Sequence, residues 1–112
     1  MHYTLRQLQV FMAVARHENV SRAAQELSLS QSAASAALGD LERQFDLRLF
    51  DRSGRRLHLN DLGRALRPRV VELLDRAQEL EDLLRRREAP GILWLGASLT
   101  IGNYLATLLI SD

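Results

Sequence analysis

Hydrophobic residues recur every three or four positions through the first half of the chain, which predicts three short helices. The first is expected to begin after Thr4, the second to cover 22–28 and the third to cover about 31–45. Each has a polar residue suited to cap its first turn: Thr4, in a capping box with Gln7, then Ser21, then Ser30. The side chains expected to be buried are Leu5, Leu8, Phe11 or Met12, Ala15, Ala23, Ala24, Leu27, Ala34, Leu38, Leu41 and Phe45.

The pattern changes after the third helix, where two short extended runs, LRLFDR and RRLHLN, flank Ser53 and Gly54. Such runs around a serine–glycine pair predict a β-hairpin. Asn60 is then placed to cap a long helix over about 61–87. The second and third helices, separated by a break of about three residues, have the helix-turn-helix pattern, in which Ala24 is small enough for the close crossing of the two helices.

One face of the third helix carries almost no large side chains. It consists of Ser32, Ser35, Ala36 and Gly39, opposite the stripe that is expected to be buried. For a helix taken alone, packing of such a face against another helix is an open alternative. In a helix-turn-helix this face enters the major groove of DNA, where short side chains let the backbone approach the base edges. Gln31, at the start of the helix, is a residue type that can bond adenine through N6 and N7.

The net charge of the chain is only +1, so it does not by itself suggest a nucleic-acid partner. The distribution of the basic residues along the sequence is more informative. All 15 basic residues are arginine, whose rigid charged fork suits phosphates and base edges. Many of them lie within residues 43–58, which contain Arg43, Arg48, Arg52, Arg55 and Arg56 against the two acids Asp46 and Asp51. A basic hairpin after a helix-turn-helix predicts a winged helix whose wing reaches the adjacent minor groove. For Arg52, a salt bridge to an acid at the edge of the core is the alternative.

The chain resembles the amino-terminal half of the LysR-type transcriptional regulators from residue 5 through the long helix. The segments that carry the resemblance are SRAAQELSLSQSAAS at 21–35, LE at 41–42, LFDR at 49–52 and LNDLG at 59–63. The resemblance implies a mainly α fold: a winged helix-turn-helix of three helices and a two-stranded wing (1–60), a long dimerisation helix (61–88) and the start of an α/β effector-binding domain (89–112). It also implies a transcriptional regulator that binds a two-fold symmetric site on double-stranded DNA as a homodimer or tetramer.

Position by position, the resemblance assigns DNA contacts to two helices and the wing. Gln31, Ser32 and Ser35 match positions that contact bases and phosphates. Ser21 and Arg22 match a phosphate-facing helix N-terminus, where free backbone N–H groups favour an anion. The full predicted DNA-binding set is Ser21, Arg22, Ser30, Gln31, Ser32, Ser35, Ala36, Arg52, Arg55 and Arg56.

The third helix also departs from the family pattern. Ala36 stands where many relatives carry a polar or long residue, and Gly39 and Asp40 stand where basic residues are common. A glycine within a helix costs roughly 1 kcal/mol relative to alanine, and Asp40 would repel a nearby phosphate. These departures predict weaker affinity through this helix and a larger share of binding through the wing.

The long helix has one apolar stripe with alternating spacings of four and three, as in a coiled coil. A lone helix of this kind needs a partner, and the antiparallel pairing of linker helices in the family fits. Packing against the protein's own winged helix is the alternative for Leu62 and Leu66. Pro68 is expected to kink the helix or to end it early. The predicted dimerisation residues are Leu66, Val70, Leu73, Ala77, Leu80 and Leu84.

The last segment, 91–110, is twenty residues without a charge and follows three arginines. Its length satisfies the rule for a membrane span, but its polar and glycine-rich centre favours a strand, a polar loop and a helix. In relatives such a loop helps to bind a small effector, so Ser98 and Thr100 match effector-contacting positions. Because a parallel sheet needs further strands, effector binding is expected only in a longer chain. Whether the sequence is a fragment or a natural truncation stays open.

Several classes of protein are disfavoured by what the sequence lacks. Without cysteine there is no disulfide or thiolate metal site. The three histidines are scattered, and no catalytic set or glycine-rich phosphate loop occurs, so no enzyme activity, cofactor or metal is expected. Without a signal-peptide pattern, a cytoplasmic protein is expected. A dimeric DNA-binding regulator is the main hypothesis, and the alternatives are a truncated dimerisation module that titrates longer partners and a membrane-anchored winged helix.

Overall fold

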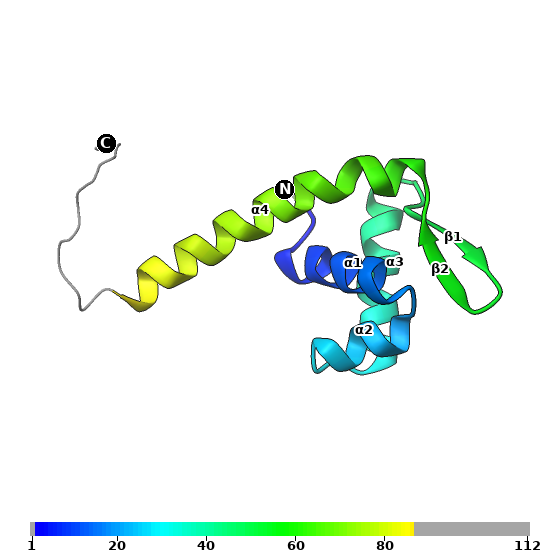
Figure 1. Cartoon of the computed structure of the whole chain (residues 1–112), viewed down its shortest axis with the longest axis horizontal. Coiled ribbons are helices and arrows are strands. Elements are labelled where there is room, and N and C mark those ends of the chain that lie inside the picture. Colours follow the sequence, from blue (N-terminus) through cyan, green and yellow to red (C-terminus); the bar gives the residue numbers. More distant parts are fainter. Residues whose placement is uncertain (1, 87–112) are drawn as a thin grey trace. The chain divides into compact units, whose positions relative to one another are not determined.

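The computed structural model describes residues 2–86. The elements are, in chain order, α1 (Leu5–His17), α2 (Val20–Glu26), α3 (Gln31–Gln44), β1 (Phe50–Ser53), β2 (Arg56–Leu59) and α4 (Asp61–Arg85) (Figure 1). The predicted fold class is confirmed: a helix-turn-helix with a two-stranded wing is followed by a long helix. The predicted beginning of an effector domain at 89–112 lies outside the described residues.

Local hydrogen bonding explains where the helices begin. The capping box of Thr4 and Gln7 is present, and the Ser30 hydroxyl oxygen accepts the Ala33 N–H at 3.0 Å, as predicted. The prediction for Ser21 is wrong, because the N-cap of α2 is Asn19, whose side-chain oxygen accepts the Arg22 N–H at 2.9 Å. Asparagine and serine are both strong N-cap residues, so α2 begins two residues earlier than the serine alone predicts.

The core lies where α1 packs against α2, α3 and β2. Its buried side chains include most of the predicted stripes, and Phe11 meets Phe50 of the wing with ring centroids 5.6 Å apart. Two predictions of burial are wrong. Leu5, in the first turn of α1, is 47% exposed, and Phe45, the residue after the last turn of α3, is 51% exposed. Ala15 and Leu27 are only partly buried.

The wing is an antiparallel pair in which Phe50 faces Leu59 and Ser53 faces Arg56. The hairpin was expected to turn at Ser53–Gly54, but the turn residues are Gly54 and Arg55. Gly54 has a φ of 62°, a backbone conformation that L-residues rarely adopt. The turn therefore places the Arg55 side chain at the tip of the wing.

The wing is joined to α4 by a close backbone approach. Asn60 donates its backbone N–H to the Leu49 carbonyl at 3.0 Å and its side-chain N–H to the Arg48 carbonyl at 2.8 Å. Its side-chain oxygen accepts the Gly63 N–H at 2.8 Å, which confirms Asn60 as the cap of the long helix. A Cβ at Gly63 would lie 2.3 Å from the Leu49 oxygen, so this position has room only for glycine.

The first half of α4 belongs to the same compact unit as the winged helix, which extends through Arg76. Val70 is 3% exposed, and Leu66 and Leu74 are partly buried against the core. Val70 thus packs mainly against the core of its own chain, and its place in a dimerisation seam stays a prediction. The helix continues through Pro68 to Arg85, so no early break occurs. No helix within residues 2–86 is long and apolar enough to cross a membrane.

Candidate nucleic-acid interface

The small-residue face of α3 points away from the core. Ser32, Ser35 and Ala36 are exposed and Gly39 is partly exposed. On the opposite side, Ala34, Leu38 and Leu41 are buried. The outward orientation that the sequence predicted is therefore present in the described part of the chain, and after Gln31 the exposed side chains of this face through residue 36 are no larger than serine.

Arg43 contributes a positive charge to the same face, although the predicted DNA-binding set does not include it. A Cβ at Gly39 would lie 3.1 Å from Nη1 of Arg43, so the guanidinium occupies the space that the missing side chain leaves. Asp40 pairs with this guanidinium, and both side chains are more than half exposed. The spacing of four residues between Gly39 and Arg43 places them on one helix face, and this was the signal available in the sequence.

Ser21 and Gln31 lie together between α2 and α3. The Ser21 hydroxyl donates a hydrogen bond to Oε1 of Gln31 at 2.7 Å, which restrains the carboxamide at the first position of α3. The Gln31 amide N–H groups keep their donor capacity for an outside acceptor. Ser30 beside it caps the helix with its hydroxyl oxygen and keeps its own O–H as a donor.

The predicted anion site at the start of α2 is altered by the change of N-cap. The Arg22 N–H donates to Asn19, so it is not free for a phosphate. The Arg22 side chain itself is exposed. Its role as a phosphate contact stays a prediction that rests on the guanidinium rather than on the helix terminus.

All three predicted wing arginines are exposed, but they differ in their partners. Arg56 forms an ion pair with Glu18, which lies at the end of α1. Arg52, for which a salt bridge was the alternative, forms no ion pair with any residue in 2–86, and neither does Arg55. The salt bridge that was the alternative for Arg52 is therefore formed by Arg56 instead.

A second carboxylate joins the ends of α1 and α2. Glu26 accepts hydrogen bonds from His17, at 2.7 Å from Nε2, and from Arg16. These two partners hold the pKa of Glu26 below its ordinary value of 4.5. The side chains of Arg16, His17 and Glu26 are all partly exposed, so their ion pairs contribute little to stability.

The lowered pKa of Glu26 gives a pH prediction with a definite sign. A carboxyl group with a lower pKa in the folded state stabilises the fold fully above its unfolded pKa, and this contribution is lost as the pH falls through the folded pKa. In urea titrations between pH 7 and 3, Glu26→Gln should reduce the acid-dependent loss of unfolding free energy. The control is Glu79→Gln, which removes one exposed carboxylate that has no ion-pair partner within residues 2–86. Identical profiles for the Glu26 variant and the wild type would contradict the assignment.

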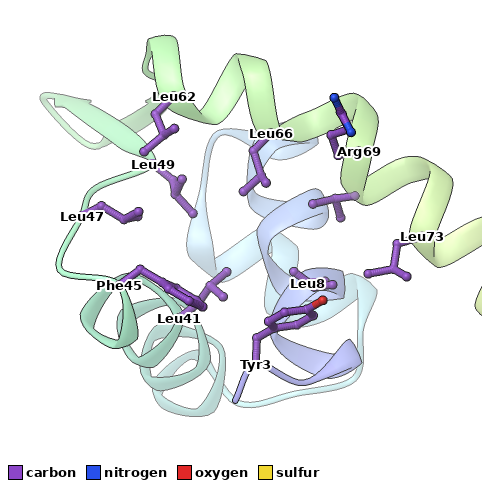
Figure 2. A pocket seen from close by; sticks show the side chains of 11 residues that line it. Tyr3, Leu8, Leu41, Phe45, Leu47, Leu49, Leu62, Leu66, Arg69 and Leu73 are labelled. Carbon is purple, nitrogen blue, oxygen red and sulfur yellow. The ribbon is translucent and has the colours of Figure 1, made fainter. Parts of the chain in front are cut away.

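A groove of 340 Å³ with an almost wholly apolar lining lies on the side of the unit where α4 crosses the helices. Leu66 and Leu73 of α4 line it on one side, and Leu41 of α3 and Phe45, just after α3, face them (Figure 2). Val70 also belongs to the lining. Phe45, which was expected to be buried, projects into this groove. Among the described residues, Arg69 is the one charged residue in the lining.

The family of the chain follows from comparison with known proteins. The family model described as "Bacterial regulatory helix-turn-helix protein, lysR family" matches residues 5–64, which include α1 to α3, the wing and the cap of α4. The chain belongs to the lysR family. The resemblance that the sequence motifs indicated is thereby confirmed.

Relatives of this lysR-family chain are named as regulators. YeiE of Escherichia coli K12, described as an uncharacterized HTH-type transcriptional regulator, is 50% identical over 111 residues, which are 99% of this chain and 37% of the relative. The RuBisCO operon transcriptional regulator of Allochromatium vinosum is 38% identical over 113 residues, again 99% of this chain and 37% of the relative. The chain thus spans about 37% of the length of these relatives. Both names agree with the prediction of a regulator rather than an enzyme.

Solved structures of the family share the fold. A hydrogen-peroxide-bound OxyR mutant of Corynebacterium glutamicum matches with a TM-score of 0.73 and 32% identity, over 76% of this chain and 26% of that one. The complex of the CbnR DNA-binding domain with DNA matches with a TM-score of 0.67 and 32% identity, over 77% of this chain and 97% of that one. The predicted effector-contacting residues Ser98 and Thr100 lie outside the described residues.

Proposed function

We propose that this lysR-family chain binds a specific site on double-stranded DNA as a dimer. The small-residue face of α3 enters the major groove, and the wing contacts the backbone beside it. The observation that carries the proposal is the outward orientation of Ser32, Ser35 and Ala36, which allows the helix backbone to come close to base edges. The structural likeness to the CbnR–DNA complex supports it.

The electrostatics of the face support the same function. Arg43, Arg52 and Arg55 are exposed around the small-residue face and on the wing. Asp40, which was expected to repel phosphate, is paired with Arg43, so its charge is largely compensated. Gln31 presents its amide donors at the start of α3, where side chains of a recognition helix reach deepest. Base contacts from Gln31 and phosphate contacts from arginines are the two kinds of contact that such an interface needs.

The wing's role can be tested by the dependence of binding on salt. Each phosphate contact that is lost flattens the slope of log K against log salt by about 0.9. Arg52→Ala/Arg55→Ala should therefore flatten this slope by nearly two units in fluorescence anisotropy with a duplex selected from a random pool. Arg86→Ala, just after the last residue of α4, removes a charge outside the proposed interface and should leave the slope within about 0.3 of wild type. A double variant with the wild-type slope would exclude the wing from DNA binding.

The exposed leucines of α4 support dimerisation. Leu73, Leu80, Leu83 and Leu84 are 39%, 57%, 61% and 60% exposed, and a monomer leaves them in water. In an antiparallel pair with its two-fold axis at residue 75, Leu84 of one copy faces Leu66 of the other, and Leu80 faces Val70. The leucine-rich end of each helix would then cover the apolar groove of its partner. Two copies would also read a two-fold symmetric DNA site.

This pairing predicts the effect of shortening one leucine. Leu84→Ala should raise the dimer dissociation constant about tenfold, because symmetry repeats the loss of buried apolar area at both ends. Sedimentation equilibrium would measure it. Glu79→Ala, on the same helix but outside the stripe, is the control. If the two variants dimerise equally, the stripe does not form the interface. Dimerisation without DNA binding would favour the alternative, a module that titrates longer partners.

A further inference from the structure

Glu18 contacts the wing through both its backbone and its side chain. Its carbonyl oxygen accepts the Leu57 N–H at 3.1 Å. Its carboxylate pairs with Arg56, and Oε2 lies 3.1 Å from Nδ1 of His58. These partners are three consecutive residues of β2, so the end of α1 contacts the edge of β2 that does not pair with β1.

The alternation of the strand explains how one residue makes these contacts. Arg56 and His58 point to the same side of β2, since successive side chains alternate, and Leu57 between them is buried in the core. The carboxylate thus bridges the two polar side chains while the backbone bond fixes the residue between them. The pKa of Glu18 lies below its ordinary value because of the hydrogen bonds from Arg56 and His58, so the anchor is charged at neutral pH.

The backbone of Glu18 has a conformation in which glycine is the easier residue. Glu18 is the C-cap of α1 with a φ of 56°, in the left-handed region, where glycine is strongly preferred. A glycine would end α1 more easily but could not bind Arg56 or His58. What a glutamate adds here over a glycine is therefore its contacts with Arg56 and His58 of the wing.

We propose that Glu18 is a positioning residue for DNA binding, which fixes the wing against α1 through its ion pair with Arg56. Arg52 and Arg55 then supply the phosphate contacts of the wing. This division of roles among the wing arginines rests on the proposed function. Arg56, which the sequence assigned to DNA contact, becomes an anchor of the wing. Because Gly54 and Arg55 form the turn beyond β2, the orientation of the strand sets where the turn meets DNA.

Glu18→Gly separates the anchor from the fold. Glycine relieves the left-handed conformation, so the melting temperature should stay equal or rise. The affinity for a selected duplex should nevertheless fall about three- to tenfold, the range expected for a partly exposed charged contact. The NMR order parameters of the Gly54 and Arg55 amides should fall from about 0.85 toward 0.6 without DNA. Unchanged order parameters would overturn the proposal whatever the DNA result.

Arg56→Ala and Arg55→Ala test the division of roles. Arg55→Ala should flatten the salt slope by about 0.9, whereas Arg56→Ala should lower affinity at every salt concentration with little change of slope. Glu18→Gly/Arg56→Ala should bind as Glu18→Gly does, because both changes break one anchor.

The opposite result has a distinct signature. If Glu18 merely shields an Arg56 that contacts phosphate, Glu18→Gly would bind more tightly and Arg56→Ala would flatten the slope by about 0.9. Either finding would overturn the proposal while the proposed function stands. If Arg52→Ala and Arg55→Ala also left the slope unchanged, the proposed function of the wing would fail, and the order parameters would still decide whether Glu18 anchors it.

Discussion

Ser35→Glu should lower the affinity of the chain for a selected duplex by about a hundredfold, or roughly 2.7 kcal/mol. Ser35 lies in the middle of the small-residue face and is exposed. A glutamate there adds a like charge opposite the phosphates and holds the helix backbone away from the base edges. Electrophoretic mobility shift or anisotropy titrations at fixed salt would measure the loss. Because the site is exposed, the free energy of unfolding should change by no more than about 0.5 kcal/mol.

Gln44→Glu is the matched control for this change. It alters the charge of the same helix by the same amount, on an exposed residue outside the small-residue face. Its effect on affinity should be within about threefold, since a distant exposed charge is screened by salt. If Ser35→Glu left DNA affinity intact but weakened dimerisation, the face would pack against another helix, which is the alternative that the sequence left open.

Gly63→Ala should destabilise the fold by about 3 kcal/mol, a large share of the stability of a small domain. The added Cβ would lie 2.3 Å from the Leu49 oxygen and 2.7 Å from Cδ2 of Leu59. The first of these atoms belongs to the backbone, so α4 must move away as a whole. Such a shift lengthens the hydrogen bond that the Asn60 backbone N–H donates to the same Leu49 oxygen. Urea unfolding monitored by circular dichroism would measure the loss.

Gly39→Ala is the control for Gly63→Ala, because it makes the same substitution in another helix. Its nearest neighbour would be the end of the Arg43 side chain, 3.1 Å away, which can move. Helix propensity then dominates, and the variant should be more stable by about 1 kcal/mol. Equal stability changes at the two glycines would show that the close approach of α4 to Leu49 does not limit the fold.

The features that local chemistry determines could be predicted from the sequence. The caps at Thr4, Ser30 and Asn60 each need a partner only three residues away. The orientation of α3 follows from one apolar stripe opposite one small-residue face, so it can be predicted without knowing any distant contact. For the same reason the wing was found from two extended runs around a glycine.

Features that depend on distant contacts could not be predicted in this way. The partner of Arg56, Glu18, is 38 residues away in sequence, and no spacing rule distinguishes Arg56 from Arg52. The apolar stripe of α4 is continuous in the sequence. The sequence therefore does not distinguish Val70, which packs on the core of its own chain, from Leu80, which is exposed. Phe45 continues the buried stripe of α3 but lies beyond its last turn, where the helix ends and the side chain reaches the groove.

The central claim, that the small-residue face of α3 meets DNA, is tested most directly by chemical protection. Because the chain contains no cysteine, single-cysteine variants at Ser35 and Gln44 report on one position each, and cysteine is nearly the size of serine. The rate of alkylation by iodoacetamide, followed by mass spectrometry with and without a selected duplex, gives the accessibility of each thiol. Bound DNA should slow modification at position 35 at least about tenfold and leave position 44 unchanged. A thiol at position 35 that reacts at the same rate in the DNA complex would contradict the account.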